Sequence, residues 1–141
     1  MSSNWPNGVG RIVLPSTDST LSEAARVFPT LTGPAWIMAH EQTAARGRRG
    51  RPWVFPKGNF AGTYVMPIAG APETAALRSF VMALALYDAV AAATGRPEAL
   101  SLKWPNDVLL NGGKLAGILL ESITQGGRIA GLAIGIGVNL V

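Results

Sequence analysis

Short apolar runs separated by glycine-rich turns fill the last third of the chain. Residues 108–110 form one such run and residues 115–120 form the next. Residues 111–113, Asn-Gly-Gly, tolerate positive φ, so the pattern predicts a β-hairpin. Residues 124–127 predict a second turn, and residues 129–136 predict a third apolar strand.

Three further apolar runs predict strands in the first half: residues 11–14 at a sheet edge, Ala35–Ala39 and residues 60–68. The longest helix is predicted over Glu73–Thr94, opened by Pro72 and closed by Gly95. Its apolar residues recur at helical spacing, at Leu77, Phe80, Val81, Leu84, Tyr87 and Val90. Together these elements predict an α+β fold with a mixed, mainly antiparallel sheet flanked by helices.

A polar run at residues 16–20 precedes a short predicted helix that ends near Phe28. Thr20 and Glu23 fit a capping box, and Asp18 or Ser19 are alternative caps. A helix cap explains this run without any function. The alternative is that its hydroxyls and the first helical amides face a ligand.

The composition indicates one domain over residues 1–141 and excludes several kinds of site. The hydrophobic share is 48%, and there is no cysteine and one histidine. Disulfides, thiolate nucleophiles, zinc-thiolate sites and multi-histidine metal sites are therefore excluded within one chain. No secretory signal or long uninterrupted apolar run is visible, since Arg78 and Asp88 interrupt Glu73–Thr94. We therefore expect a cytoplasmic protein with no membrane partner.

The positive charge is concentrated in one loop. The formal net charge is +4, and Arg46, Arg48, Arg49 and Arg51 lie within a few residues of one another. A solvated basic loop, including one that contacts RNA or DNA, is one interpretation. The other is a lid that becomes ordered over an anionic ligand, with guanidinium groups as bidentate clamps. No aromatic platform accompanies the arginines, which disfavours nucleic acid.

Two lysines lie beside predicted turns. Lys103 precedes the turn predicted at residues 105–107, and Lys114 follows the turn at residues 111–113. Charges on rigid strand ends suit the binding of an anion in a fixed place.

Several separate motifs resemble one family. Residues 103–107, Lys-Trp-Pro-Asn-Asp, and residues 114–119, Lys-Leu-Ala-Gly-Ile-Leu, followed by Glu121, resemble the core signature of biotin protein ligases. Four other blocks agree in type and order, namely Asp18-Ser19-Thr20, Gln42, residues 46–51 with Trp53, and residues 135–139. The resemblance runs from about Ser16 to the last residue.

The resemblance implies a fold related to lipoate ligases and to class II aminoacyl-tRNA synthetases. It implies an enzyme that makes biotinyl-5′-AMP from biotin and MgATP, and transfers biotin to a lysine of a biotin carboxyl carrier protein. Because this family's catalytic domain normally continues past the position of Val141, we expect a C-terminally truncated domain. No DNA-binding helix-turn-helix precedes it, so we expect no repressor role. The sequence leaves open whether the chain forms a homodimer.

The resemblance also assigns roles to residues. It implies a biotin pocket lined by Ser19, Thr20, Gln42, Lys114 and Gly117. It implies an adenylate-binding loop that carries Arg46, Arg48, Arg49, Arg51 and Trp53. ATP phosphate and magnesium would be served by Lys103, Asn106 and Asp107, with Asp107 as the metal ligand. The nucleotide side would be closed by Gly135, Gly137 and Asn139. The residues expected to act in catalysis are Lys103, Asp107, Lys114 and Arg48.

Two positions depart from the family pattern. Ala45 stands where glycine is common, which predicts a stiffer first turn of the loop, and Pro52 stands where a basic residue is usual.

Three alternatives remain: a lipoate ligase or acyltransferase of the same fold, a basic nucleic-acid-binding module, and an inactive fragment that dimerises through an open sheet edge.

Overall fold

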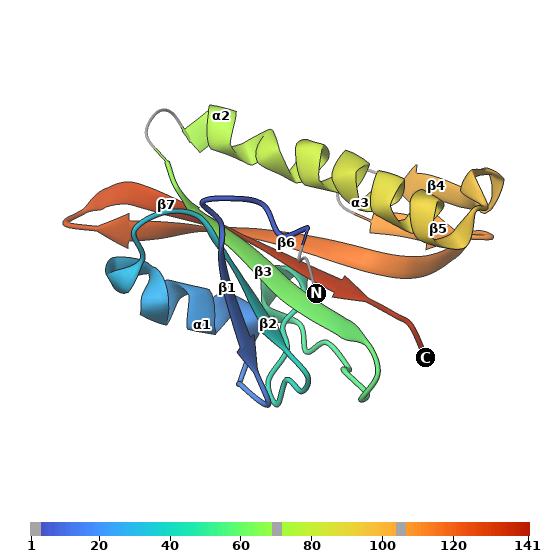
Figure 1. Ribbon diagram of the computed structural model, residues 1–141, viewed down its shortest axis with the longest axis horizontal. Helices are drawn as coiled ribbons and strands as arrows, with labels where there is room; N and C mark the ends of the chain where they lie inside the picture. Colours follow the sequence, from blue (N-terminus) through green and yellow to red (C-terminus); the bar gives the residue numbers. More distant parts are fainter. Residues whose placement is uncertain (1–3, 69–71, 104–106) are drawn as a thin grey trace.

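A seven-stranded sheet forms the centre of the molecule, with strand order β1-β2-β3-β7-β6-β5-β4 (Figure 1). The computed structural model describes residues 4–68, 72–103 and 107–141. The strands are β1 Gly10–Leu14, β2 Ala35–Ala39, β3 Phe60–Pro67, β4 Leu100–Lys103, β5 Asp107–Leu110, β6 Gly113–Gln125 and β7 Arg128–Val138. Within the described ranges, β1 and β2 pair in parallel and every other neighbouring pair is antiparallel. The predicted α+β fold with a mixed, mainly antiparallel sheet is therefore confirmed.

The helices lie on opposite faces of this sheet. Helix α1, Thr20–Val27, packs on one face, and α2, Pro72–Ala76, and α3, Arg78–Thr94, lie on the other (Figure 1). The single predicted helix is thus two helices. The break follows a tight turn in which the Leu77 N–H donates to the Thr74 carbonyl at 3.3 Å, an i→i+3 bond. Helix α3 ends as predicted, at Gly95 in the left-handed region (φ 67°).

The two faces carry separate apolar cores. On the α1 face, Leu21 and Ala24 pack with Ile37 of β2 and Val65 of β3. On the other face, Ala83, Tyr87 and Val90 of α3 belong to a core with residues of β5, β6 and β7. The central strands β3, β6 and β7 therefore alternate their side chains between two apolar layers.

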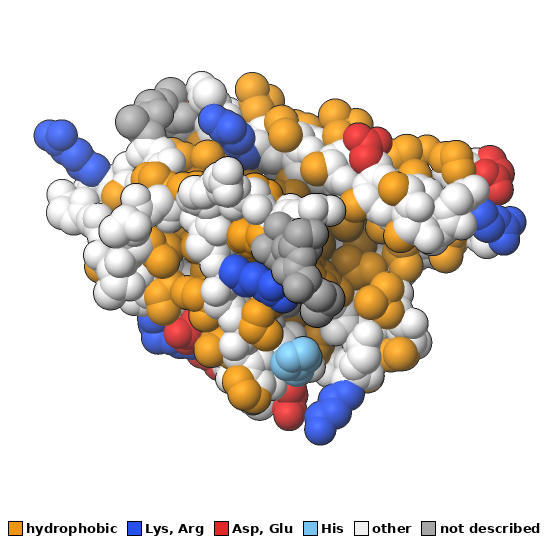
Figure 2. Space-filling model, in the orientation of Figure 1, with side chains coloured by type: hydrophobic (Ala, Val, Ile, Leu, Met, Phe, Trp, Pro, Cys, Tyr) orange, Lys and Arg blue, Asp and Glu red, His pale blue; other side chains and the backbone are white. Residues whose placement is uncertain are grey.

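The outward side of α3 is apolar. Leu77, Val81 and Leu84, which recur at helical spacing in the sequence, are 58%, 60% and 57% exposed. Hydrophobic side chains accordingly cover the outer surface over α3 (Figure 2). The helical spacing was right, but the sheet covers only the side that contains Ala83. Segment Glu73–Thr94 also has the length and mean hydropathy (1.5) of a membrane span. Packing on the sheet accounts for only one side of this segment, because Leu77, Val81 and Leu84 remain exposed.

The predicted hairpins are confirmed, and the strands are longer than expected. Asn111 (φ 50°) and Gly112 (φ 83°) make the turn between β5 and β6 in the left-handed region. Strands β6 and β7 extend to the turn at Gly126 and Gly127. Strand β4 was not predicted, because its sequence Leu-Ser-Leu-Lys is short. The turn predicted at residues 105–107 falls mostly outside the described residues, and Asp107 already belongs to β5.

Candidate active site

Two loops meet at the end of the parallel strand pair and form one side of the site. Strands β1 and β2 run in parallel, so the loops that follow them leave the sheet at the same edge. The Thr17 N–H donates to the Glu41 carbonyl at 3.1 Å, and the Thr43 N–H returns a bond to the Thr17 carbonyl at 2.9 Å. The Ala44 N–H donates to the Asp18 carbonyl at 2.8 Å. The two loops are therefore fixed to each other by their backbones.

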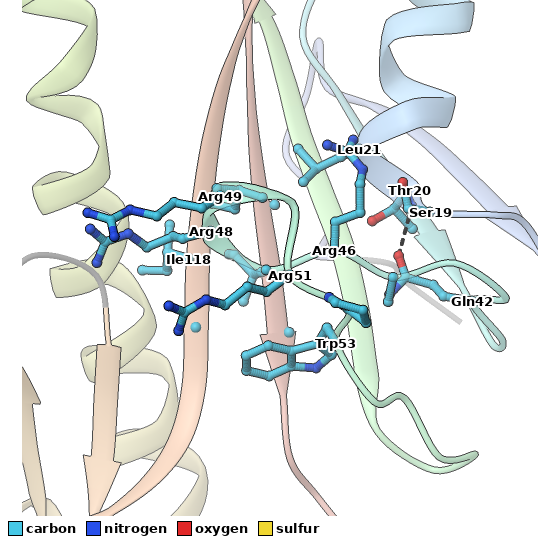
Figure 3. Close-up of a pocket in the computed structure, with 18 of the residues that line it drawn as sticks. Ser19, Thr20, Leu21, Gln42, Arg46, Arg48, Arg49, Arg51, Trp53 and Ile118 are labelled. Atoms are coloured by element: carbon cyan, nitrogen blue, oxygen red, sulfur yellow. Dashed lines mark hydrogen bonds between the residues drawn. The ribbon is translucent and has the colours of Figure 1, made fainter.

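Three polar side chains are held at the start of α1. Ser19 caps the helix by accepting from the Ser22 N–H at 3.0 Å, as one of the predicted alternatives had it. The capping box centred on Thr20 was wrong, because the Thr20 hydroxyl is 2.8 Å from the buried Thr63 hydroxyl of β3. The Thr20 N–H donates to Gln42 Oε1 at 2.8 Å (Figure 3). Ser19, Thr20 and Gln42 are therefore rigidly connected.

An ion pair behind this segment fixes Asp18. Arg26 Nη2 lies 2.6 Å from Asp18 Oδ1, which also accepts the Ser19 N–H at 2.7 Å. The Arg26 guanidinium, followed by the Ser19 N–H, holds the pKa of the Asp18 carboxyl far below its ordinary range. Asp18 in turn raises the pKa of Arg26. The carboxylate thus orients the backbone just before the helix.

We expect Asp18→Asn to lower the melting temperature of the chain by a few degrees at neutral pH. Asparagine can still accept the Ser19 N–H, but it cannot pair with the Arg26 charge. A carboxyl with a lowered folded-state pKa stabilises the fold fully above its ordinary pKa. This contribution decreases as the pH falls below about 4 and is lost as the pH falls through the lowered folded-state pKa. Thermal unfolding of parent and variant should therefore converge only in strongly acidic solution. An equal difference in melting temperature between parent and variant at pH 7 and pH 2 would contradict this. Asp88→Asn, which changes an exposed carboxylate, is the control.

The arginine loop, residues 45–53, crosses in front of the sheet. Arg46 and Pro52 form a bridge, the Gly47 N–H donates to the Arg51 carbonyl at 2.6 Å, and the Trp53 N–H donates to the Ala45 carbonyl at 2.9 Å. The tip is a 3-10 turn, Arg48–Gly50, in which Arg49 adopts φ 59°. The loop is thus a compact hairpin. Its predicted mobility before ligand binding stays a prediction.

Glycines of β6 and β7 form the floor of the site. Gly117 pairs with Gly137, and Leu119 pairs with Gly135. A Cβ at Gly117 would lie 3.3 Å from the Trp53 ring, and a Cβ at Gly135 would lie 2.8 Å from Leu21. The missing side chains therefore let Trp53 and Leu21 approach the sheet closely.

A lysine and a carboxylate lie together at the end of the floor. Lys114 Nζ is 3.3 Å from Asp107 Oδ1 and 4.6 Å from the centre of the Trp53 ring. Lys103 opposes Asp107 across the β4–β5 pair, so the two side chains leave the same face of the sheet. Asp107 is therefore flanked by two lysines.

These residues enclose a cavity of about 470 Å³. Thirteen of the residues singled out from the sequence line it: Ser19, Thr20, Gln42, Arg46, Arg48, Arg49, Arg51, Trp53, Asp107, Lys114, Gly117, Gly135 and Gly137. Lys103 does not line it. Asn139 also lies outside, where its side chain donates to the Lys114 carbonyl at 3.3 Å and accepts from Asn59. Asn106 lies outside the described residues.

Sequence analysis missed several contributors to the site. Leu21 supplies apolar lining, and Thr63 supports Thr20 from β3. Leu119 also lines the cavity and was quoted only as part of a motif. Glu121 was quoted only as part of a motif, yet its carboxylate pairs with Arg46 at 2.9 Å. A threonine in the apolar strand β3 was the available signal for Thr63.

The two departures from the family pattern have simple structural accounts. Ala45 does not adopt positive φ, and its buried side chain lines the cavity, so alanine imposes no backbone strain there. Pro52 lines the cavity as well, at the position where a basic side chain would add charge.

Comparison with known proteins identifies the family. The sequence profile of the biotin/lipoate A/B protein ligase family matches residues 10–139. The chain belongs to this ligase family. This chain is 59% identical to the biotin–[acetyl-CoA-carboxylase] ligase of Paracoccus denitrificans. The match covers 91% of this chain and 53% of that protein. It therefore covers about half the length of this relative.

Solved structures agree with the ligase-family assignment. The biotin protein ligase of Leishmania major in complex with biotinyl-5-AMP superposes with a TM-score of 0.81 at 31% identity, over 97% of this chain and 59% of that one. The biotin protein ligase of Aquifex aeolicus in complex with biotin and ATP gives a TM-score of 0.78 at 29% identity, over 92% and 52%. The predicted relation to the biotin protein ligase fold is thus confirmed.

Proposed function

We propose that this chain is the adenylate-forming module of a biotin–[acetyl-CoA-carboxylase] ligase. The observation that carries the proposal is a single cavity in which neutral hydroxyl and amide groups lie at one end and cations at the other. Thr20 and Gln42 mark the neutral end, and Lys114 with the arginine loop marks the cationic end. The relatives that bind biotin, ATP or biotinyl-5-AMP support it.

The neutral end suits the ureido ring of biotin. That ring needs uncharged hydrogen-bond donors and acceptors, which serine, threonine, glutamine and backbone amides provide. Ser19, Thr20 and Gln42 are held by the bonds described above, so they would meet the ring without reorganising. The glycine floor and Trp53 would cover the apolar part of the molecule.

The cationic end suits the reaction. An oxygen of the biotin carboxylate would attack the α-phosphorus of ATP, forming the acyl–phosphate bond while the bond to pyrophosphate breaks. The two anions repel each other, so the residues must offset charge rather than supply a nucleophile. Lys114 lines the cavity beside Asp107 and Trp53, where it would contact both carboxylate and phosphate. Lys103, Arg48 and their neighbours would bind phosphate oxygens.

Magnesium would be held at Asp107. Protein sites for Mg²⁺ commonly use one or two carboxylates and complete the shell with substrate phosphates and water. Among the described residues, no group of three or more His, Cys, Asp or Glu side chains could hold an ion alone. One carboxylate beside the cavity fits this shared arrangement. The bound ion would stabilise the charge on the departing pyrophosphate.

The second half-reaction would use a protein partner. In it, a lysine amine of a biotin carboxyl carrier protein would attack the biotinyl carbonyl, forming an amide and releasing AMP. The loop that carries Arg48 would shield the anhydride from water until that lysine arrives.

Calorimetric titration tests the proposal. We expect the chain to bind one equivalent of biotin, and we expect MgATP to tighten the complex because the adenylate fills both ends of the cavity. Lipoate is the matched control, because its dithiolane ring has no ureido group for Thr20 and Gln42. Heat from lipoate and none from biotin would replace the proposal with a lipoate ligase.

Trypsin digestion gives the second readout of this test. The peptide bonds after Arg46, Arg48 and Arg49 should be cut quickly in the free chain and slowly with biotin plus MgATP. Protection by RNA or DNA, but not by biotin plus MgATP, would favour a nucleic-acid-binding module.

A further inference from the structure

The first arginine of the loop is held by contacts to β6 and α1. Arg46 Nη1 lies 2.9 Å from Glu121 Oε1, and Arg46 Nη2 donates to Ser22 Oγ at 3.2 Å. In Figure 3 the Arg46 side chain extends upward toward Leu21, whereas Arg48, Arg49 and Arg51 extend to the left, away from Leu21. The Arg46 side chain therefore points to a different region of the molecule from the other three arginine side chains of the loop.

The position of Glu121 on the sheet requires a positive charge beside its carboxylate. It follows Leu119 by two residues on β6, so its side chain points to the face that contains the cavity. Its Oε1 atom is buried without a hydrogen bond of good geometry, although it lies close to Arg46, and its Oε2 atom accepts from Arg46 Nη1 at 3.3 Å. Arg46 therefore supplies the charge that compensates a shielded carboxylate oxygen.

The same guanidinium is connected to the helix cap. Ser22 Oγ, which accepts from Arg46, lies 2.9 Å from Ser19 Oγ. The chain of contacts runs from the sheet at Glu121 through Arg46 to the start of α1. These contacts hold the Arg46 guanidinium beside Glu121 and the start of α1 in the ligand-free chain.

We propose that Glu121 is a positioning residue that fixes the base of the arginine loop through Arg46. Arg46 serves as an anchor, and the loop beyond it, with Arg48, Arg49 and Arg51, contacts the anionic ligand. This inference rests on the proposed function for the identity of that ligand. The anchor itself exists in the free chain.

Limited trypsin digestion of the ligand-free chain tests the anchor. In Glu121→Gln the carboxamide keeps the shape but loses the charge, so the loop should open more often and be cut about fivefold faster after Arg48 and Arg49. The reversed pair, Arg46→Glu with Glu121→Arg, should return the cleavage rate toward that of the parent. Fragment masses identify the bonds that are cut.

The controls separate an anchor from general destabilisation. Glu98→Gln removes the exposed ion pair with Arg96, 3.4 Å long and far along the chain from the loop, and should leave the cleavage rate unchanged. Parental cleavage in Glu121→Gln would overturn the inference, as would a reversed pair cut as fast as the single variant. Because no ligand is present, this result is independent of biotin binding. A parent chain that binds no biotin would contradict the proposed function alone.

Discussion

Replacing Lys114 by alanine should slow biotin-dependent ATP–pyrophosphate exchange by at least about a hundredfold, the usual effect of removing one group that stabilises transition-state charge. Lys114 lies beside both Asp107 and Trp53 and lines the cavity. Its ammonium would be in contact with the attacking carboxylate and the α-phosphate as their charges approach. Biotin affinity should also fall, by about tenfold, because the carboxylate loses its counter-ion.

The fold should tolerate this change. The Lys114 side chain is 42% exposed, so its ion pair with Asp107 contributes less than about 1 kcal/mol to the free energy of unfolding. The melting temperature checks that point. Lys57→Ala removes an exposed lysine that does not line the cavity and is the matched control. Exchange at the parental rate in Lys114→Ala would remove Lys114 from the mechanism.

Asp107→Asn is expected to have the second largest effect, a loss of about a hundredfold in adenylation with biotin affinity changed only a few-fold. Asparagine keeps the shape of the side chain but is a poorer magnesium ligand. The variant also frees Lys114 from its 3.3 Å contact, so a small change in biotin affinity reports how far Asp107 positions that lysine.

A magnesium titration of pyrophosphate exchange distinguishes the two roles of Asp107. If it holds the ion, the variant should need a higher magnesium concentration for half-maximal rate. Asp88→Asn, on the exposed side of α3, should behave like the parent. Normal exchange by Asp107→Asn at limiting magnesium would show that the ion is held elsewhere.

The local features of the fold could be predicted because they depend on neighbours in sequence. Asn111 and Gly112 specify their turn through positive φ, and Gly95 ends α3 for the same reason. The side of α3 that faces the sheet could not be predicted, because Val81 and Leu84 satisfy the helical spacing as well as Ala83 does. Only the position of the sheet decides among them.

The residues of the candidate site also fall into those that the sequence could predict and those that it could not. Residues within the motifs, such as Thr20 and Lys114, could be placed near one another because the resemblance gives them a shared pocket. Thr63 and Glu121 could not be assigned roles, since their partners lie 43 and 75 residues away in the chain. A buried hydroxyl pair and a loop anchor depend on strand register, which the sequence pattern does not supply.

The cavity lies on the α1 face of the sheet and α3 lies on the other face. The chain could therefore be attached to a surface through a single residue of α3 without covering the cavity. The chain contains no cysteine, so a cysteine introduced at Leu84 would be the only thiol. That side chain is 57% exposed and belongs to the helix on the far side of the sheet from the glycine floor. A chain coupled to a sensor surface through this thiol would present its cavity to the solution, with all chains in one orientation.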